Sequence, residues 1–361
     1  MINIRNVLIA IGSAIVAGGL VSCGGGGGGG GGTPTPYSVG GTVSGLLDPV
    51  VLQLNGAGNH TITALGGFTF PGSLANGSTY NVTVLTQAAG QSCSIANGTG
   101  TLSGGNVTNV SVTCVVNAVI RSGSLTGAQE NPPVTTAATG RGAVLVDPAT
   151  LEIIGGMTFT GVTPTAGGHH IHQAPSGNPT ANGPVIIGLI LAPDNVTATV
   201  PAGTTLTDAQ YTALLAGELY FNVHSAANPS GEIRGQINVQ GGVIAGVAAL
   251  DGAQEVPTNA SMATGLGTIV FDSATRAILI CYVTHDVVGT NVAHIHTGAP
   301  GVSGPANVVT LTQGTNIYTA PSPTTLTAQQ VTDLTAGNTY FNVHSLPNFA
   351  AGEIRGQIAV Q

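Results

Sequence analysis

The sequence predicts an all-β protein with three folded units, and three observations support this fold class. Short runs alternate apolar and polar residues, which is the side-chain period of a strand. Only 6% of the residues are charged, so the chain cannot supply many charged amphipathic helices. About two-thirds of the chain is a tandem duplication. We therefore expect one N-terminal domain followed by two copies of a second domain.

The duplication shows in four blocks that recur at an offset of 120 to 125 residues. In the last three blocks, one strand face is apolar and the other carries His, Asn, Glu or Arg. Function is expected in what both copies keep. The blocks are Gly-Ala-Gln-Glu (127–130 and 252–255), His-Ile-His (170–172 and 294–296), Tyr-Phe-Asn-Val-His-Ser (220–225 and 340–345) and Gly-Glu-Ile-Arg-Gly-Gln-Ile (231–237 and 352–358).

These blocks resemble the chordin-type (CHRD) domain, here in two copies at about residues 117–240 and 241–361. The resemblance implies β-sandwich-like extracellular modules, known from animal chordins and many bacterial surface proteins. It implies no settled chemistry and carries over no catalytic residue. Within each copy we expect one short helix, at 206–215 and 326–334, with a threonine N-cap and a glycine after its end.

The start of the chain predicts export and lipidation. Residues 1–22 hold Arg5 and then an apolar run that is short for a spanning helix, as in a signal peptide. The run ends in Leu-Val-Ser-Cys, which resembles the bacterial lipobox and makes Cys23 the lipidated residue. Gly24 supplies no acidic retention signal, so this resemblance implies attachment to the bacterial outer membrane. Residues 23–36, mostly glycine, read as a flexible tether.

Residues 37–116 read as a small immunoglobulin-like β-sandwich, because short alternating runs are separated by Asn-Gly turns. Cys93 and Cys114 both fall in this domain. An exported chain folds in an oxidising compartment, so we expect these two cysteines to form a disulfide.

The net negative charge of the chain argues against nucleic acid and anionic lipid headgroups as binding partners. The formal net charge is −8 at pH 7, with six arginines and no lysine. Such a chain offers no basic patch for nucleic acid or for anionic lipid headgroups. Membrane attachment must then come from the lipid on Cys23, and the remaining partner is an unidentified protein or glycan.

Both copies keep three histidines, which leave two interpretations open. Two histidines on one strand face and a third on another strand have a geometry able to bind zinc or copper. A glutamate would then be a fourth ligand or a partner that orients a ring. Alternatively, the rings belong to a polar network with Glu and Arg that fixes strand register. The residues are His170, His172, His224, Glu232 and Arg234 in the first copy, and His294, His296, His344, Glu353 and Arg355 in the second.

Cys281 occurs in only one copy, in a strand rich in apolar residues, so we expect a buried and inert thiol. No catalytic motif is recognisable, and the sequence predicts a protein that is not an enzyme and needs no cofactor. The favoured function is a lipid-anchored envelope module for binding or adhesion. The alternative is a zinc or copper protein, including a redox metalloenzyme.

Overall fold

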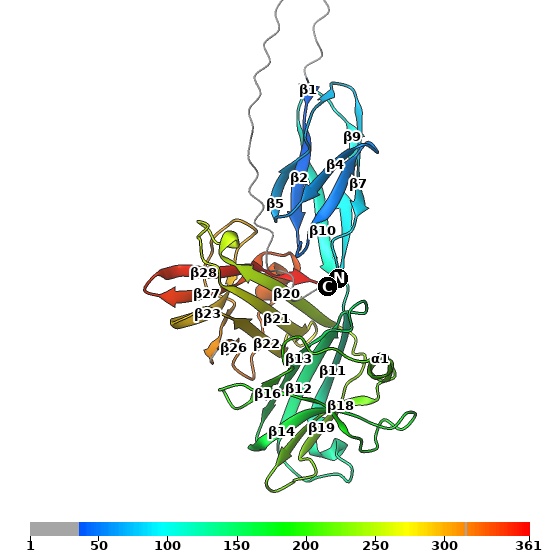
Figure 1. The fold of residues 1–361 in the computed structure, drawn as a ribbon, viewed down its shortest axis with the longest axis vertical. Coiled ribbons are helices and arrows are strands. Elements are labelled where there is room, and N and C mark those ends of the chain that lie inside the picture. The colour runs from blue at the N-terminus through cyan, green and yellow to red at the C-terminus, as the bar shows by residue number, and fades with distance from the viewer. Residues whose placement is uncertain (1–35, 315) are drawn as a thin grey trace, which may run out of the picture.

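The computed structural model describes residues 36–314 and 316–361, which form three β-rich units along the chain (Figure 1). The predicted signal peptide, Cys23 and almost all of the tether lie outside the described residues. Within the part described, no helix is long and apolar enough to cross a membrane. The predicted all-β fold class is confirmed, since strands make up nearly all of the regular structure.

The N-terminal unit packs two four-stranded sheets, with strand orders β5-β2-β10-β8 and β4-β3-β7-β9, around one apolar core. Cys93 on β8 and Cys114 on β10 are direct cross-strand partners and form the predicted disulfide. The strands are β1 (Pro36–Tyr37), β2 (Val39–Ser44), β3 (Val50–Leu54), β4 (Gly58–Ile62), β5 (Gly66–Thr69), β6 (Leu74–Ala75), β7 (Thr79–Thr86), β8 (Gln91–Ala96), β9 (Thr99–Thr101) and β10 (Val107–Val116).

The first repeat is one curled nine-stranded sheet in the order β15-β14-β18-β19-β11-β12-β13-β17-β16. Its elements are β11 (Val119–Thr126), the 3-10 turn η1 (Gly127–Gln129), β12 (Thr139–Val146), β13 (Ile153–Thr160), β14 (Pro164–Gln173), β15 (Val185–Gly188), β16 (Ile190–Leu191), β17 (Thr197–Thr199), α1 (Asp208–Leu215), β18 (Leu219–Ser225) and β19 (Ile233–Gln236).

The second repeat has the equivalent strand order, β24-β23-β27-β28-β20-β21-β22-β26-β25, with β29 added on β20. Its elements are β20 (Val243–Asp251), η2 (Gly252–Gln254), β21 (Thr264–Asp272), β22 (Ile278–His285), β23 (Thr290–Thr297), β24 (Val309–Thr310), β25 (Thr312–Gln313), β26 (Ile317–Thr319), α2 (Ala328–Thr335), β27 (Thr339–Leu346), β28 (Phe349–Gln357) and β29 (Ala359–Val360).

Each repeat encloses its own apolar core between the walls of the curled sheet. Cys281 is buried in the core of the second repeat, as predicted, and burial raises the pKa of its thiol far above the ordinary range. The predicted helices are also confirmed. Thr207 and Thr327 cap α1 and α2 with complete capping boxes, and Gly217 and Gly337 follow with a left-handed φ of 72°.

A fourth apolar cluster lies between the two repeats, where β12 and β13 face β22 (Figure 1). Val144 and Val146 of β12 point into their own core, whereas Ala143 and Leu145 point into this interface. These strands are therefore apolar on both faces, because both faces are buried. The second repeat contributes Ala245, Val247, Val270, Ile280, Tyr282 and Ala359.

Candidate metal centre

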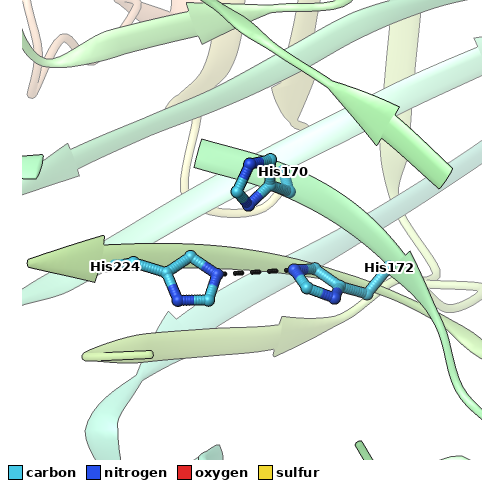
Figure 2. A group of neighbouring side chains, drawn as sticks. All are labelled: His170, His172 and His224. Carbon is cyan, nitrogen blue, oxygen red and sulfur yellow. Dashed lines mark hydrogen bonds between the residues drawn. The ribbon is translucent and has the colours of Figure 1, made fainter. Parts of the chain in front are cut away.

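The His-Ile-His block places two imidazoles on one face of β14. Ile171 between them is fully buried in the core, so His170 and His172 stand on the opposite face. The third ring, His224, comes from the neighbouring strand β18. Figure 2 shows the three rings turned toward one another, and one ring nitrogen from each lies within 4.8 Å of the others.

Two main-chain carbonyl groups fix the tautomers of His172 and His224. The Nδ1 atom of His172 lies 3.0 Å from the carbonyl oxygen of Gly183, and that of His224 lies 3.0 Å from the carbonyl oxygen of Pro229. A carbonyl oxygen only accepts hydrogen bonds, so each Nδ1 must carry the proton. In a neutral ring the other nitrogen, Nε2, then holds a lone pair.

These two lone pairs face each other. The Nε2 atoms of His172 and His224 are 3.4 Å apart, a contact drawn as the dashed line in Figure 2. Neither Nε2 has a proton to donate, so two neutral rings repel each other here. A cation between them removes the repulsion. Two nitrogens that each lie about 2.0–2.1 Å from a tetrahedral zinc ion are separated by about 3.3–3.4 Å, which matches the observed distance.

Burial favours the neutral form of all three rings. Burial lowers the pKa of His172 to about 4, and burial also lowers the pKa values of His170 and His224. Neutral imidazole is the form that binds metal ions. A shared proton between the two Nε2 atoms would require one ring to be charged, and burial opposes that charge.

The second repeat reproduces this geometry independently. The Nε2 atoms of His296 and His344 are again 3.4 Å apart, and their Nδ1 atoms face the carbonyl oxygens of Gly304 at 2.9 Å and Ala350 at 3.1 Å. Burial lowers the pKa of His296 to about 4. In the third ring, His294, the Nδ1 atom is buried and has no hydrogen-bond partner among the described residues.

A tyrosine and an arginine brace the first site. The ring of Tyr220 stacks on His172, with centroids 5.0 Å apart, and the guanidinium carbon of Arg234 lies 3.5 Å from the Tyr220 centroid. The three side chains come from adjacent strands, in the order β14, β18, β19. The hydroxyl of Tyr220 accepts from the N–H of Gly183, whose carbonyl group orients His172.

Arg234 also holds the loop that carries Gly183. This side chain is 1% exposed and donates to the carbonyl oxygens of Pro179 at 2.7 Å and Ala181 at 3.1 Å, and to the side chain of Asn182. In the second repeat, Arg355 lies 3.6 Å from the Tyr340 centroid and donates to two carbonyl oxygens of the matching loop. Sequence reasoning missed the tyrosines, although both occupy the same face as the histidine in the repeated Tyr-Phe-Asn-Val-His block.

The predicted glutamates are not brought into the histidine groups. The carboxylate of Glu232 accepts from the hydroxyl of Thr136 at 2.8 Å, and hydrogen bonds led by that from Ser225 lower its pKa. Glu353 accepts from Ser261 at 2.7 Å and from Ser345. Arg234 and Arg355 donate to loop carbonyl oxygens instead of to these glutamates. The predicted fourth-ligand role and the predicted network of Glu with Arg are therefore replaced by separate contacts, because hydroxyl groups engage the glutamates and loop carbonyl oxygens engage the arginines.

Two other buried histidines stand apart from these groups. His169 and His285 each occur in one repeat, and each side chain is buried with at least one ring nitrogen that lacks a hydrogen-bond partner in the described part of the chain. The two rings do not belong to either three-histidine group. Their separate placement agrees with the expectation that a shared site uses only residues present in both copies.

The comparisons with known proteins identify the repeated unit. The family model described as the CHRD domain matches the chain twice, at residues 121–237 and 247–358, which together cover more than half of it. No curated protein and no solved structure matches the chain. The chain belongs to the CHRD domain family, and it carries two CHRD domains in tandem.

Proposed function

We propose that each CHRD domain binds one zinc or copper ion through its three histidines, so that the chain holds two ions. The observation that carries this proposal is the opposed pair of Nε2 lone pairs, 3.4 Å apart in both repeats. Two repeats that differ in most residues have kept the same repulsive contact. Such a contact is costly in the absence of a cation and favourable in its presence.

Ligand chemistry favours zinc and copper. Imidazole nitrogen suits both ions, whereas calcium and magnesium prefer oxygen ligands. Three protein ligands leave a fourth position for water or for a small ligand. We assign a binding role to these centres instead of catalysis, because the neighbouring glutamates Glu232 and Glu353 are already engaged by hydroxyl groups.

The cellular context remains part of the proposal. We infer that Cys23 carries a lipid, that the glycine-rich segment after it spaces the domains from the membrane, and that the protein sits on the bacterial outer membrane. The sequence at residues 1–36 supports this through its apolar run and its Leu-Val-Ser-Cys ending.

Adhesion to a protein or glycan is the second candidate function, and a hollow on the second repeat favours it. A cavity of about 370 Å³ is lined by Met262, Val288, Phe349, Asp286 and Glu353, among others. The side chains of Met262 and Val288 at this cavity are 73% and 87% exposed. The aligned positions in the first repeat are Ala137 and Thr163, so these two large apolar side chains are specific to the second repeat.

Metal content tests the first function. The metal-free full chain should take up two zinc or copper ions, measured by elemental analysis after gel filtration and by calorimetric titration. His224→Ala and His344→Ala should each leave one ion, and the double variant none. His60→Ala, in the N-terminal unit, is the matched control and should leave two. An unaltered wild-type protein that takes up neither metal would eliminate the proposal and leave the adhesion function.

A further inference from the structure

Each repeat buries a glutamate in the Gly-Ala-Gln-Glu block that the metal centre does not use. Glu130 follows η1 and is 6% exposed, and Glu255 follows η2 and is also 6% exposed. A lone carboxylate at such a position loses most of its hydration, which is costly unless several donors replace the water. The charged form of each glutamate is therefore stable only if several donors reach it.

Donors are scarce at both glutamates. The side-chain amide of Asn222 donates to Oε2 of Glu130 at 3.3 Å, and that of Asn342 donates to Oε2 of Glu255 at 3.5 Å. The other carboxyl oxygen, Oε1, has no hydrogen-bond partner among the described residues in either repeat. The amide oxygen Oδ1 of each asparagine is likewise buried without a partner there.

The two unpartnered oxygens face the same small space. A Cβ atom added to Gly231 would lie 2.6 Å from Oε1 of Glu130 and 2.8 Å from Oδ1 of Asn222. In the second repeat a Cβ on Gly352 would lie 2.5 Å from Oε1 of Glu255 and 2.7 Å from Oδ1 of Asn342. Oε2 of each glutamate lies 2.7 Å from the same point, so the glycine main chain is packed directly against the acid and the amide.

We propose that Glu130 and Glu255 are protonated carboxylic acids in the folded protein, each donating its Oε1 proton to the amide oxygen of Asn222 or Asn342. Together with the hydrogen bond from the amide nitrogen to Oε2, this closes a ring of two hydrogen bonds between acid and amide. One proton satisfies both unpartnered oxygens in each repeat.

The surrounding charges are compatible with a neutral acid. Arg234 faces Glu130 and lowers its pKa, yet the guanidinium is already bound to loop carbonyl oxygens. Burial is the largest influence on the pKa of Glu130 and raises it to about 7, against the smaller lowering by the hydrogen bond from Asn222 and by Arg234. Glu255 faces Arg355, which lowers its pKa, and Asp251, which raises it; burial is again the largest influence and brings the pKa to about 7.

The pair connects proton binding to the histidine centre. Asn222 is the register partner of His170 across β14 and β18, and it lies two residues before His224 on the same face. Loss of the proton would leave a carboxylate facing an amide oxygen, and the repulsion would displace Asn222. This link to metal binding rests on the proposed function, whereas the acid–amide pair stands without it.

Titration of the full chain tests the pair directly. With 13C-labelled glutamate, the side-chain carboxyl signals of Glu130 and Glu255 should titrate near neutral pH, with assignments from Glu130→Gln and Glu255→Gln. Ionised carboxyl groups at about pH 5 at both positions would overturn the proposal. This result does not depend on metal, so it is distinguishable from failure of the metal-binding function.

The double variant Glu130→Gln, Glu255→Gln supplies the second measurement. Glutamine replaces the acid proton with an amide N–H and keeps both hydrogen bonds, so the variant should match the wild type in thermal unfolding at about pH 5 and exceed it at about pH 8. Glu232→Gln is the control, because that carboxylate accepts hydroxyl donors and should gain nothing at high pH. A double variant that is less stable than wild type at both pH values would show that the carboxylates are needed in charged form.

Discussion

The hydroxyl group of Tyr282 in the second repeat accepts a hydrogen bond of 3.1 Å from the main-chain N–H of Gly155 in the first repeat. Tyr282 is 3% exposed and lies in the apolar cluster between the repeats. A second polar contact at this boundary joins the hydroxyl of Thr319 to the carboxylate of Asp194 at 2.7 Å. The two CHRD domains are therefore packed against each other through a buried surface with specific hydrogen bonds.

Replacement of Tyr282 by phenylalanine tests this contact. Tyr282→Phe removes the hydroxyl group and leaves the buried N–H of Gly155 without its partner, so the free energy of unfolding should fall by about 1–3 kcal/mol. Denaturant unfolding of the full chain measures the change, and Tyr37→Phe, in a partly exposed strand of the N-terminal unit, is the control. Equal stability of Tyr282→Phe and wild type would show that the inter-repeat hydrogen bond contributes nothing.

Acidification should release the metal only at low pH. Burial lowers the pKa values of His172 and His296 to about 4, so both rings stay neutral down to a lower pH than an ordinary histidine. Metal affinity should persist at about pH 5 and fall steeply near pH 4. A competition titration with a chromophoric chelator at each pH measures the metal affinity. Loss of the metal already near pH 6.5 would contradict the lowered pKa values.

The lowered pKa values of His172 and His296 also make the stability of the metal-free protein depend on pH. In the folded state these histidines bind fewer protons than in the unfolded state between about pH 4 and pH 6.5. Their contribution to stability is therefore complete above about pH 6.5 and is lost as the pH falls toward 4. Thermal unfolding of the His172→Asn, His296→Asn variant should show a weaker loss over this interval than the wild type.

Under the proposed function, Arg234 should matter for metal affinity although it is not one of the proposed ligands. Arg234→Lys keeps the charge but loses the planar group that covers Tyr220 and donates to several loop acceptors. The loop positions Gly183, so we expect the first site to lose about 10- to 100-fold in affinity, as for other residues that support a ligand. Calorimetry on a His344→Ala background isolates this site. Arg141→Lys is the control, and an unchanged affinity in Arg234→Lys would contradict the bracing role.

The lipobox interpretation predicts that Cys23 determines membrane attachment. Cys23→Ser should leave the protein unprocessed or release it into the soluble fraction, because no thiol remains for lipidation. Cell fractionation and mass spectrometry of the mature N-terminus provide the measurement, with Ser22→Ala as the control. Processing and outer-membrane attachment that are unaltered by Cys23→Ser would eliminate the lipid anchor.

The sequence by itself determined the all-β class, the duplication, the disulfide between Cys93 and Cys114, and both helices with their threonine caps. These features depend on local periodicity, on residues near one another in the chain, or on repetition of whole blocks. All three kinds of pattern can be recognised in a single sequence. The two sets of three histidines were also legible, because both copies keep them.

Only the tertiary structure decided what those histidines face. The Nδ1 contacts of His172 and His224 are made with main-chain carbonyl groups of loops, and any residue type supplies such a group. Likewise, the partners of Arg234 and Glu232 come from loops and distant strands. The buried surface around Tyr282 forms only where the two domains pack against each other. The sequence of a strand that is apolar on both faces does not show whether its second face packs against a core or against another domain. The chain therefore encodes the histidine set locally, whereas the distances and tautomers on which the proposed metal binding rests arise from contacts between segments far apart in sequence.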